Sequence, residues 1–340
     1  MKWQPNRRSQ KKNSKEKMFS RQYLPKSILP ILAGVTCFIG TGAFFYADAL
    51  KSNKMFNPAP VATESPNINQ TATNISIKIL DEEFLGSGFL VKQTGDRYVV
   101  ITNQHVLRAG EAPYKIQTPD GKIHSAKVIA SSVTSEYEYD LAILEFSSQE
   151  NYTLATIGNS FYLEIGESIY AAGFPYSNVE TAISDRSQQS KSQTESITGL
   201  AIKTGRVALI LNKALEEGYQ IGYTNDVQKG MSGGPLLNRQ GEVVGVNGKH
   251  AYPLWESPEF YQDGSQPCSA LEKLIVQSSL AIPIEKAIEL NPSLESIRPA
   301  SDTKISTKSN LDNEDPEEVA KIQQKVEETN KICSKNRGVK

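Results

Sequence analysis

One glycine-rich stretch of the sequence has the composition of a loop that could hold a nucleophile. Residues 230–235 read GMSGGP, with Ser232 at the centre. Glycine tolerates positive φ and carries no Cβ, so a serine among glycines can sit on a tight turn with its hydroxyl exposed. Backbone N–H groups can then approach a reacting carbonyl closely. Ser232 is therefore the candidate nucleophile of this chain.

A serine hydroxyl attacks a carbonyl only when a neighbouring base takes its proton and a third group orients that base. The chain has only three histidines, which are His105, His124 and His250. His105 follows an apolar run in the motif TNQHVL, and Asp140 heads another apolar run in YDLAIL. A lone carboxylate beside a buried run needs a partner, and a histidine N–H would supply one. His105 and Asp140 are therefore the candidate base and its orienting acid.

The motifs TNQHVL, YDLAIL and GMSGGPL, in this order, resemble the His, Asp and Ser motifs of the trypsin-like (chymotrypsin-fold) serine proteases. The resemblance implies an all-β fold of two six-stranded antiparallel β-barrels and a serine endopeptidase that forms an acyl-enzyme. Ser232 would attack the peptide carbonyl, His105 would carry its proton, and Asp140 would hold the His105 tautomer. Gly230 and Ser232 N–H groups would form the oxyanion hole. This chemistry needs neither a metal nor a cofactor.

Two alternatives compete with this interpretation. The serine motif also satisfies G-x-S-x-G, the nucleophile elbow of α/β-hydrolases, which requires the order Ser, acid, His and a helix after the serine. Residues 233–235 (GGP) would break that helix, and the only later histidine, His250, follows too closely for further βα units. The second alternative is a catalytically inactive protease-fold binding protein at the membrane surface, because a distorted Ser232 loop would have the same sequence.

The same resemblance assigns roles to Asp226, Gly86 and Ser87. Asp226 lies six residues before Ser232, the place of the pocket-floor acid in trypsin-like enzymes that cleave after Lys or Arg, and an acid there would attract a basic side chain. It could instead hold a loop through side-chain to backbone hydrogen bonds. Gly86 is expected to allow close backbone packing near the His105 loop, with Ser87 in a structural role.

Composition argues against nucleic-acid binding and against a zinc site, and it allows one disulfide without requiring it. Lys plus Arg is 37 and Asp plus Glu is 38, so the overall charge gives no reason to expect nucleic acid as a partner. None of the three cysteines lies in a CxxC pair, which makes a zinc site improbable. Cys268 and Cys333 could pair if the domain is exported, or remain two free thiols.

The amino-terminal part has the pattern of a membrane-targeting segment. Residues 1–26 are strongly basic, and residues 27–49 are almost wholly apolar or small over a length that spans a bilayer. The basic tail is expected in the cytoplasm, which places the rest of the chain outside. Residues 27–49 could be a transmembrane signal anchor or a signal peptide cleaved after Ala49. We expect a single-pass membrane protein with an extracytoplasmic catalytic domain, or its secreted form.

The remaining chain divides by composition into a linker, a protease domain and a tail. Residues 50–74 are rich in Pro, Asn, Thr and Ser and are expected to form a disordered linker. Short β-rich runs between turn residues predict the protease domain over 75–290, with barrel 1 at about 75–160 and barrel 2 at about 161–290. Residues 291–340 are expected to form a polar linker and a helix from Pro316 to Cys333, which could dock on the barrel, the more ordinary choice, or pair with a partner. These fifty or so residues are too few for the PDZ domain that many membrane-linked trypsin-like proteases carry.

Overall fold

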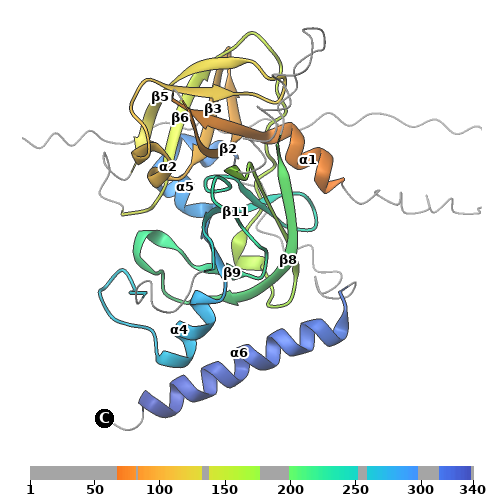
Figure 1. Ribbon diagram of the computed structural model, residues 1–340, viewed down its shortest axis with the longest axis vertical. Helices are drawn as coiled ribbons and strands as arrows, with labels where there is room; N and C mark the ends of the chain where they lie inside the picture. Colours follow the sequence, from red (N-terminus) through yellow and green to blue (C-terminus); the bar gives the residue numbers. More distant parts are fainter. Residues whose placement is uncertain are drawn as a thin grey trace, which may run out of the picture. The chain divides into compact units, whose positions relative to one another are not determined.

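The computed structural model of the chain describes residues 67–81, 83–131, 138–176, 199–251, 259–297 and 314–337. Two β-barrels, which follow one another along the chain, form most of this part (Figure 1). The predicted basic tail, the membrane segment at 27–49 and the linker up to residue 66 lie outside the described residues. Within the described ranges, no helix is both long enough and apolar enough to cross a membrane.

Barrel 1 is closed by six antiparallel strands in the order β1-β2-β3-β6-β5-β4. The strands are β1 Ser76–Leu80, β2 Phe84–Thr94, β3 Arg97–Thr102, β4 Tyr114–Gln117, β5 Ile123–Ser131 and β6 Ala142–Ser147. Because side chains alternate between the two faces of a strand, Ile77 and Ile79 of β1 both enter the barrel core. They pack there with Val100 and Leu144. Burial of alternate apolar residues therefore sets the register of this barrel.

Barrel 2 is closed in the same way, in the order β10-β11-β12-β9-β8-β7. Its strands are β7 Ser168–Gly173, β8 Ala201–Ile210, β9 Ile221–Tyr223, β10 Pro235–Leu237, β11 Val243–Lys249 and β12 Ser279–Pro283. The predicted fold of two six-stranded antiparallel barrels is thus confirmed. A further apolar cluster joins the barrels, with Phe89 and Ile143 from the first and Leu237 and Val246 from the second. Residues from both barrels can therefore meet at one site between them.

Five helices and three 3₁₀ turns accompany the barrels in the described residues, and one of these helices differs from the sequence prediction. They are α1 Ile68–Ile75, α2 Gln104–Arg108, α4 Ser269–Val276, α5 Glu285–Leu290 and α6 Pro316–Arg337, with 3₁₀ turns η1 Ser160–Tyr162, η2 Glu216–Gly218 and η3 Pro292–Ile297. The linker predicted to reach residue 74 is wrong at its end, because α1 begins at Ile68. Its buried Ala72 and Ile75 pack in the core between the barrels, and Asn67 caps its first turn. Such a short helix has too few apolar residues to show a period in the sequence.

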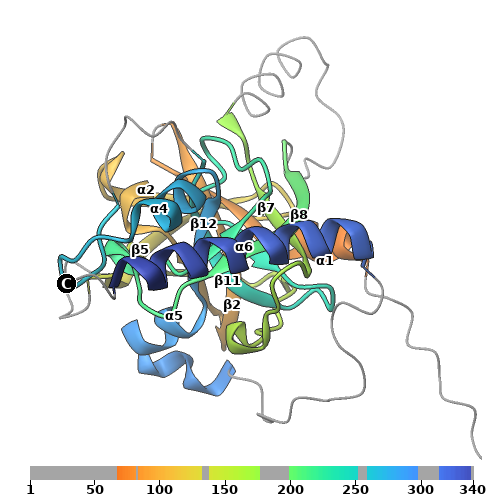
Figure 2. The same ribbon diagram turned by 90° about the horizontal axis from the view of Figure 1, so that it is seen from below.

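The predicted carboxy-terminal helix is confirmed as α6, which lies beside α4 (Figure 1). Figure 2 shows the whole length of α6 from below, with α4 next to it. A disulfide joins Cys333 of α6 to Cys268, the residue before α4, with 5.7 Å between their Cα atoms. At the other end of α6, Glu314 accepts hydrogen bonds from Arg206 of β8 and from Ser168 of β7. The helix is therefore fastened to barrel 2 at both ends.

Candidate active site

The structure brings His105 and Asp140 together. His105 lies on α2, where the buried Val106 and Leu107 anchor the helix in the core of barrel 1. The His105 Nδ1 atom is 2.5 Å from Asp140 Oδ2, and the His105 backbone N–H donates to Asp140 Oδ1 at 2.7 Å. A carboxylate can only accept, so Nδ1 carries the proton and Nε2 is left as the acceptor. The imidazole is thus held in the tautomer of a general base.

Barrel 2 supplies two more contacts to Asp140, whose side chain is only 1% exposed. The Tyr219 hydroxyl donates to Asp140 Oδ2 at 2.5 Å, and the Asp140 backbone N–H donates to the Glu217 carbonyl at 2.8 Å. Arg108 lies 3.6 Å from Asp140 Oδ1 and 3.1 Å from the Glu217 carboxylate. Burial of a carboxylate is costly unless hydrogen bonds or ion pairs compensate for the lost water. The acid of the pair is therefore held from both barrels.

Ser232 lies in the loop before β10, and its hydroxyl donates to the Gly248 carbonyl of β11 at 3.0 Å. Within the described part of the chain, Ser232 forms no hydrogen bond with His105. The two segments are neighbours all the same. The Ser87 N–H donates to the Ser232 carbonyl at 2.9 Å, and Thr102, three residues before His105, donates to the Ser87 carbonyl at 2.7 Å. The serine loop therefore packs against the segment that carries His105.

The Ser232 loop carries the two N–H groups that are expected to form the oxyanion hole. Neither Gly230 N–H nor Ser232 N–H donates a hydrogen bond to any described residue. Gly230 has φ +97°, and a Cβ at this position would come within 2.5 Å of the Phe174 carbonyl oxygen. Only glycine fits there without strain. Both N–H groups are therefore available, within the described part of the chain, as the donors that a developing oxyanion requires.

Ser87 and Gly86 have the structural roles that the sequence predicts. The Ser87 hydroxyl is fully buried, donates to the Gly230 carbonyl at 2.7 Å and accepts from the Phe174 N–H at 2.9 Å. This hydroxyl therefore fixes the Ser232 loop from barrel 1. At Gly86, a Cβ would come within 2.8 Å of the Val106 side chain. The absence of a side chain there lets α2 pack closely on β2.

Asp226 does not lie where a pocket-floor acid would. Its side chain is 78% exposed, and its carboxylate is 3.8 Å from the Lys203 ammonium. Gln228 donates to the same carboxylate at 3.1 Å. A pocket-floor carboxylate would be shielded from solvent and open to the substrate, whereas this one is exposed and already paired. These contacts do not favour a role for Asp226 in selecting Lys or Arg side chains, and that role stays a prediction.

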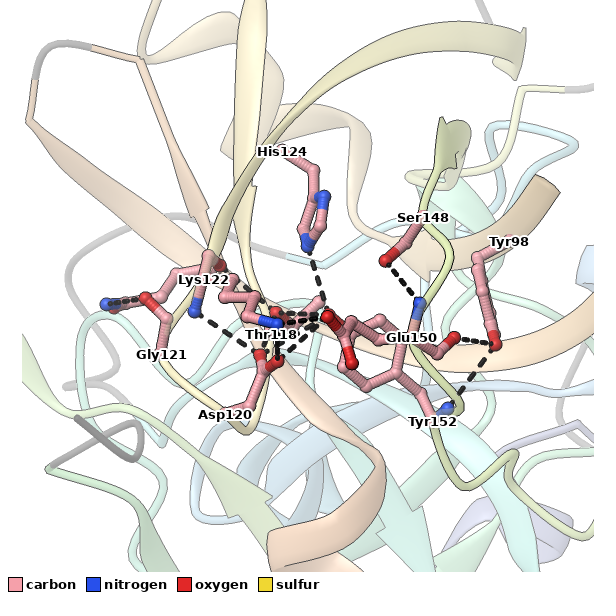
Figure 3. Close-up of polar contacts among 10 residues, drawn as sticks. Tyr98, Thr118, Asp120, Gly121, Lys122, His124, Ser148, Glu150 and Tyr152 are labelled. Carbon is pink, nitrogen blue, oxygen red and sulfur yellow. Dashed lines mark hydrogen bonds and ion pairs between the residues drawn. The ribbon is translucent and has the colours of Figure 1, made fainter. Parts of the chain in front are cut away.

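His124 belongs to a second polar cluster, at the hairpin between β4 and β5 of barrel 1. Figure 3 shows His124 and Asp120 both directed at the Tyr152 hydroxyl, which is 3.1 Å from His124 Nε2 and 3.2 Å from Asp120 Oδ2. Burial lowers the pKa of His124 below its ordinary value. Partial burial alone would raise the pKa of Asp120, but hydrogen bonds from Thr118, the Lys122 backbone and Tyr152 lower it. The third histidine, His250, is exposed.

No group of three or more His, Cys, Asp or Glu side chains in the described residues could hold a metal ion.

Sequence reasoning missed Tyr219 and Glu217 as partners of Asp140. Tyr219 is separated from Asp140 by 79 positions and sits in a run that resembles any strand. Arg108 stands beside the histidine motif, so its proximity to the site could have been inferred. Nothing in the sequence pattern connects Tyr219 to the site.

Comparison with known proteins agrees with this geometry. Residues 86–246 match the family model of the trypsin-like peptidase domain. This part of the chain is a trypsin-like peptidase domain. The matched residues include His105, Asp140 and Ser232 and end within β11 of barrel 2.

The peptidase domain is similar to several bacterial serine proteases. Serine protease Do-like HtrA of Bacillus subtilis (strain 168) is 30% identical over 164 residues, which are 48% of this chain and 32% of the relative. The periplasmic pH-dependent serine endoprotease DegQ of Escherichia coli (strain K12) is 32% identical over 165 residues, 48% of this chain and 31% of the relative. The chain thus spans about a third of the length of these relatives. A solved structure, HtrA-type protease AlgW with decapeptide, is 20% identical with a TM-score of 0.46 and covers 68% of this chain and 66% of its own.

Proposed function

We propose that this protein is a serine endopeptidase that hydrolyses peptide bonds through Ser232, His105 and Asp140. One observation carries the proposal: the buried Asp140 carboxylate lies 2.5 Å from His105 Nδ1 in a trypsin-like peptidase domain. An isolated carboxylate is costly to bury, and here hydrogen bonds from His105 offset that cost. The same bonds orient the imidazole so that its Nε2 can accept a proton. That arrangement suits general-base activation of a serine.

In the proposed reaction, rotation about the Cα–Cβ bond of Ser232 transfers its hydroxyl from the Gly248 carbonyl to His105 Nε2. Ser232 Oγ then attacks the peptide carbonyl while Nε2 takes its proton, and the resulting imidazolium is stabilised by Asp140. His105 next protonates the leaving amine, and a water molecule hydrolyses the acyl-enzyme by the same route. The contact between the serine loop and the segment before His105 supports this short rotation.

The tetrahedral intermediate places negative charge on the former carbonyl oxygen. We assign its stabilisation to Gly230 N–H and Ser232 N–H, which have no acceptor among the described residues. Each such donor contributes roughly 3 kcal/mol to the transition state in well-studied serine proteases. The Ser87 hydroxyl, bonded to the Gly230 carbonyl at 2.7 Å, would hold this peptide unit in place.

We also propose that the peptidase domain acts on protein or peptide substrates outside the cytoplasm. The relative from Escherichia coli is named as a periplasmic protease, and Cys268 and Cys333 form a disulfide, which persists in oxidising compartments. Residues 27–49 would then act as a membrane anchor or as a signal peptide removed near Ala49. Fractionation of cells that express the full chain, with protease added outside the membrane, would test this location.

Treatment of the full-length protein with a fluorophosphonate, followed by mass spectrometry of the labelled peptide, tests the proposed chemistry. We expect the label on Ser232, its loss in His105→Ala, and its retention in His124→Ala. The His124 variant is the matched control because it removes another half-buried imidazole of the same barrel. A well-folded protein without label would favour the catalytically inactive binding protein, an alternative supported by the hydrogen bond that Ser232 donates to Gly248.

A further inference from the structure

We propose that Tyr219 is a positioning residue of this site, whose hydroxyl, supplied by barrel 2, keeps the Asp140 carboxylate in the orientation that binds His105. The inference rests on the proposed function, since it concerns the same acid and base. The Tyr219 hydroxyl and His105 Nδ1 both bond to Asp140 Oδ2, each at 2.5 Å. Together with the His105 N–H on Oδ1, they make three donors on one carboxylate. Without Tyr219, only donors from the His105 residue itself would remain, apart from the longer contact with Arg108.

The turn that carries Tyr219 is held rigidly. The Leu215 N–H donates to the Tyr219 carbonyl at 2.9 Å, and the Glu216 N–H donates to the Phe260 carbonyl at 2.8 Å. Glu217 has φ +61°, a left-handed conformation that non-glycine residues adopt only when their surroundings impose it. Its carbonyl accepts the Asp140 N–H. The turn therefore contacts both the backbone and the side chain of Asp140.

The Tyr219 ring also touches the strand that receives the serine hydroxyl. A Cβ at Gly248 would fall on the Tyr219 hydroxyl and ring, so the absence of a side chain there makes room for the phenol. The Gly248 carbonyl is the acceptor of Ser232 Oγ. On the other side, the Lys249 ammonium lies 4.9 Å from the ring centroid and pairs with the buried Glu259. The phenol is thus fixed between the acid of barrel 1 and the serine side of barrel 2.

The hydroxyl of Tyr219 is a proton donor at the pH values at which a histidine base works. Burial and the charge of Asp140 raise the pKa of Tyr219 well above its ordinary value. The phenol is therefore neutral at the pH values at which a histidine base works. A neutral donor stabilises the carboxylate without adding a second charge to the site.

The test compares Tyr219→Phe with Tyr98→Phe in the full-length protein. Tyr98 is a matched control, because it is also fully buried and its hydroxyl donates one hydrogen bond, at 2.7 Å to the Glu150 carbonyl, remote from Asp140. The rate of fluorophosphonate labelling is followed over a range of probe concentrations up to saturation, which gives the maximal rate and the half-saturating concentration separately. We expect the maximal rate of Tyr219→Phe to fall about ten- to a hundredfold, as for a lost hydrogen bond to a charged group, with half-saturation unchanged.

A proton spectrum supplies a readout that does not depend on activity. The His105 Nδ1 proton, bonded to Asp140, should give a resonance far downfield that shifts or broadens in Tyr219→Phe and stays in place in Tyr98→Phe. Wild-type labelling rates in Tyr219→Phe, an unmoved Nδ1 resonance, or a Tyr219→Phe protein that does not fold would each overturn the positioning role. If the wild-type protein takes no label but the resonance responds to Tyr219→Phe, the proposed function fails and the positioning role stands.

Discussion

Two clusters in this molecule combine a histidine, a tyrosine and an aspartate, and they differ in which group lies at the centre. In the first, the Asp140 carboxylate is central and accepts from both His105 and Tyr219. In the second, the Tyr152 hydroxyl is central and contacts both His124 and Asp120. A central carboxylate can stabilise an imidazolium directly, whereas a central hydroxyl separates the two. The same residue types therefore form the proposed catalytic arrangement in one place and a different arrangement, within one barrel, in the other.

Burial and chain connectivity separate the clusters further. The Asp140 side chain is 1% exposed, whereas that of Asp120 is 32% exposed and also pairs with Lys122. The second cluster lies within barrel 1 and ties the β4–β5 hairpin to the segment after β6 (Figure 3). The first joins two barrels. Because Tyr219 comes from barrel 2, the first cluster lies where the two barrels meet, and Ser232 belongs to that same second barrel.

The largest expected difference comes from removing the charge of each aspartate. Asp140→Asn should lower the rate of fluorophosphonate labelling and of casein hydrolysis by about 10⁴, because the His105 tautomer is no longer fixed. Asp120→Asn should leave both rates within about twofold of wild type, a bound that reflects its remote position. Equal losses in the two variants would contradict the assignment of separate roles.

The next largest difference concerns two glycines with positive φ, Gly230 of the serine loop and Gly121 of the β4–β5 hairpin, at +97° and +82°. Gly230→Ala should lower the maximal labelling rate by about 10² to 10³, because the displaced backbone removes an oxyanion donor. Gly121→Ala should lower only the free energy of unfolding, by about 1–2 kcal/mol, from left-handed strain. Labelling kinetics and urea unfolding of both variants provide the comparison. An active Gly230→Ala would remove Gly230 from the oxyanion hole.

A smaller effect is expected from deleting the hydroxyl of Tyr152. Tyr152→Phe leaves Asp120 and His124 without their shared partner, and it should lower the free energy of unfolding by about 1–2 kcal/mol. Its labelling rate should equal that of wild type, in contrast to Tyr219→Phe. Urea denaturation and labelling of the two variants side by side measure this contrast. A catalytic defect in Tyr152→Phe would mean that the clusters communicate.

The smallest effect is the pH dependence that the second cluster gives to stability. The folded-state pKa of His124 is lowered by burial, so the unfolded chain takes up the proton first, and stability should fall as the pH drops below about 6.5. The folded-state pKa of Asp120 is also lowered, so its stabilising contribution is present above the unfolded value of about 4 and is lost below it. Urea unfolding should be measured between pH 7.5 and pH 3. The loss of unfolding free energy below about pH 6.5 should be smaller in His124→Phe, and the loss below about pH 4 should be smaller in Asp120→Asn. Unchanged pH profiles in both would contradict these assignments.

Much of the candidate site could be predicted from local sequence. His105, Asp140 and Ser232 stand in short motifs whose neighbours also determine their setting, such as the glycines that allow the Ser232 loop its conformation. The barrel strands show as short apolar runs between turn residues. The exposure of Asp226 could not be predicted, because its distance from Ser232 along the chain does not determine which way its side chain points. α1 was missed, because its two buried apolar residues acquire a partner only when the barrels meet.

The sequence by itself determined the two-barrel fold, the three residues of the proposed triad and the carboxy-terminal helix, since each depends on short-range patterns of apolar, turn and capping residues. Only the tertiary structure decided that Tyr219 and Glu217 hold Asp140, that Cys268 lies beside Cys333, and that His124 contacts Tyr152. Those contacts join residues far apart in the chain, and they form because apolar burial brings the barrels and helices together. Side chains of quite ordinary type acquire their partners from that packing, which no local pattern encodes.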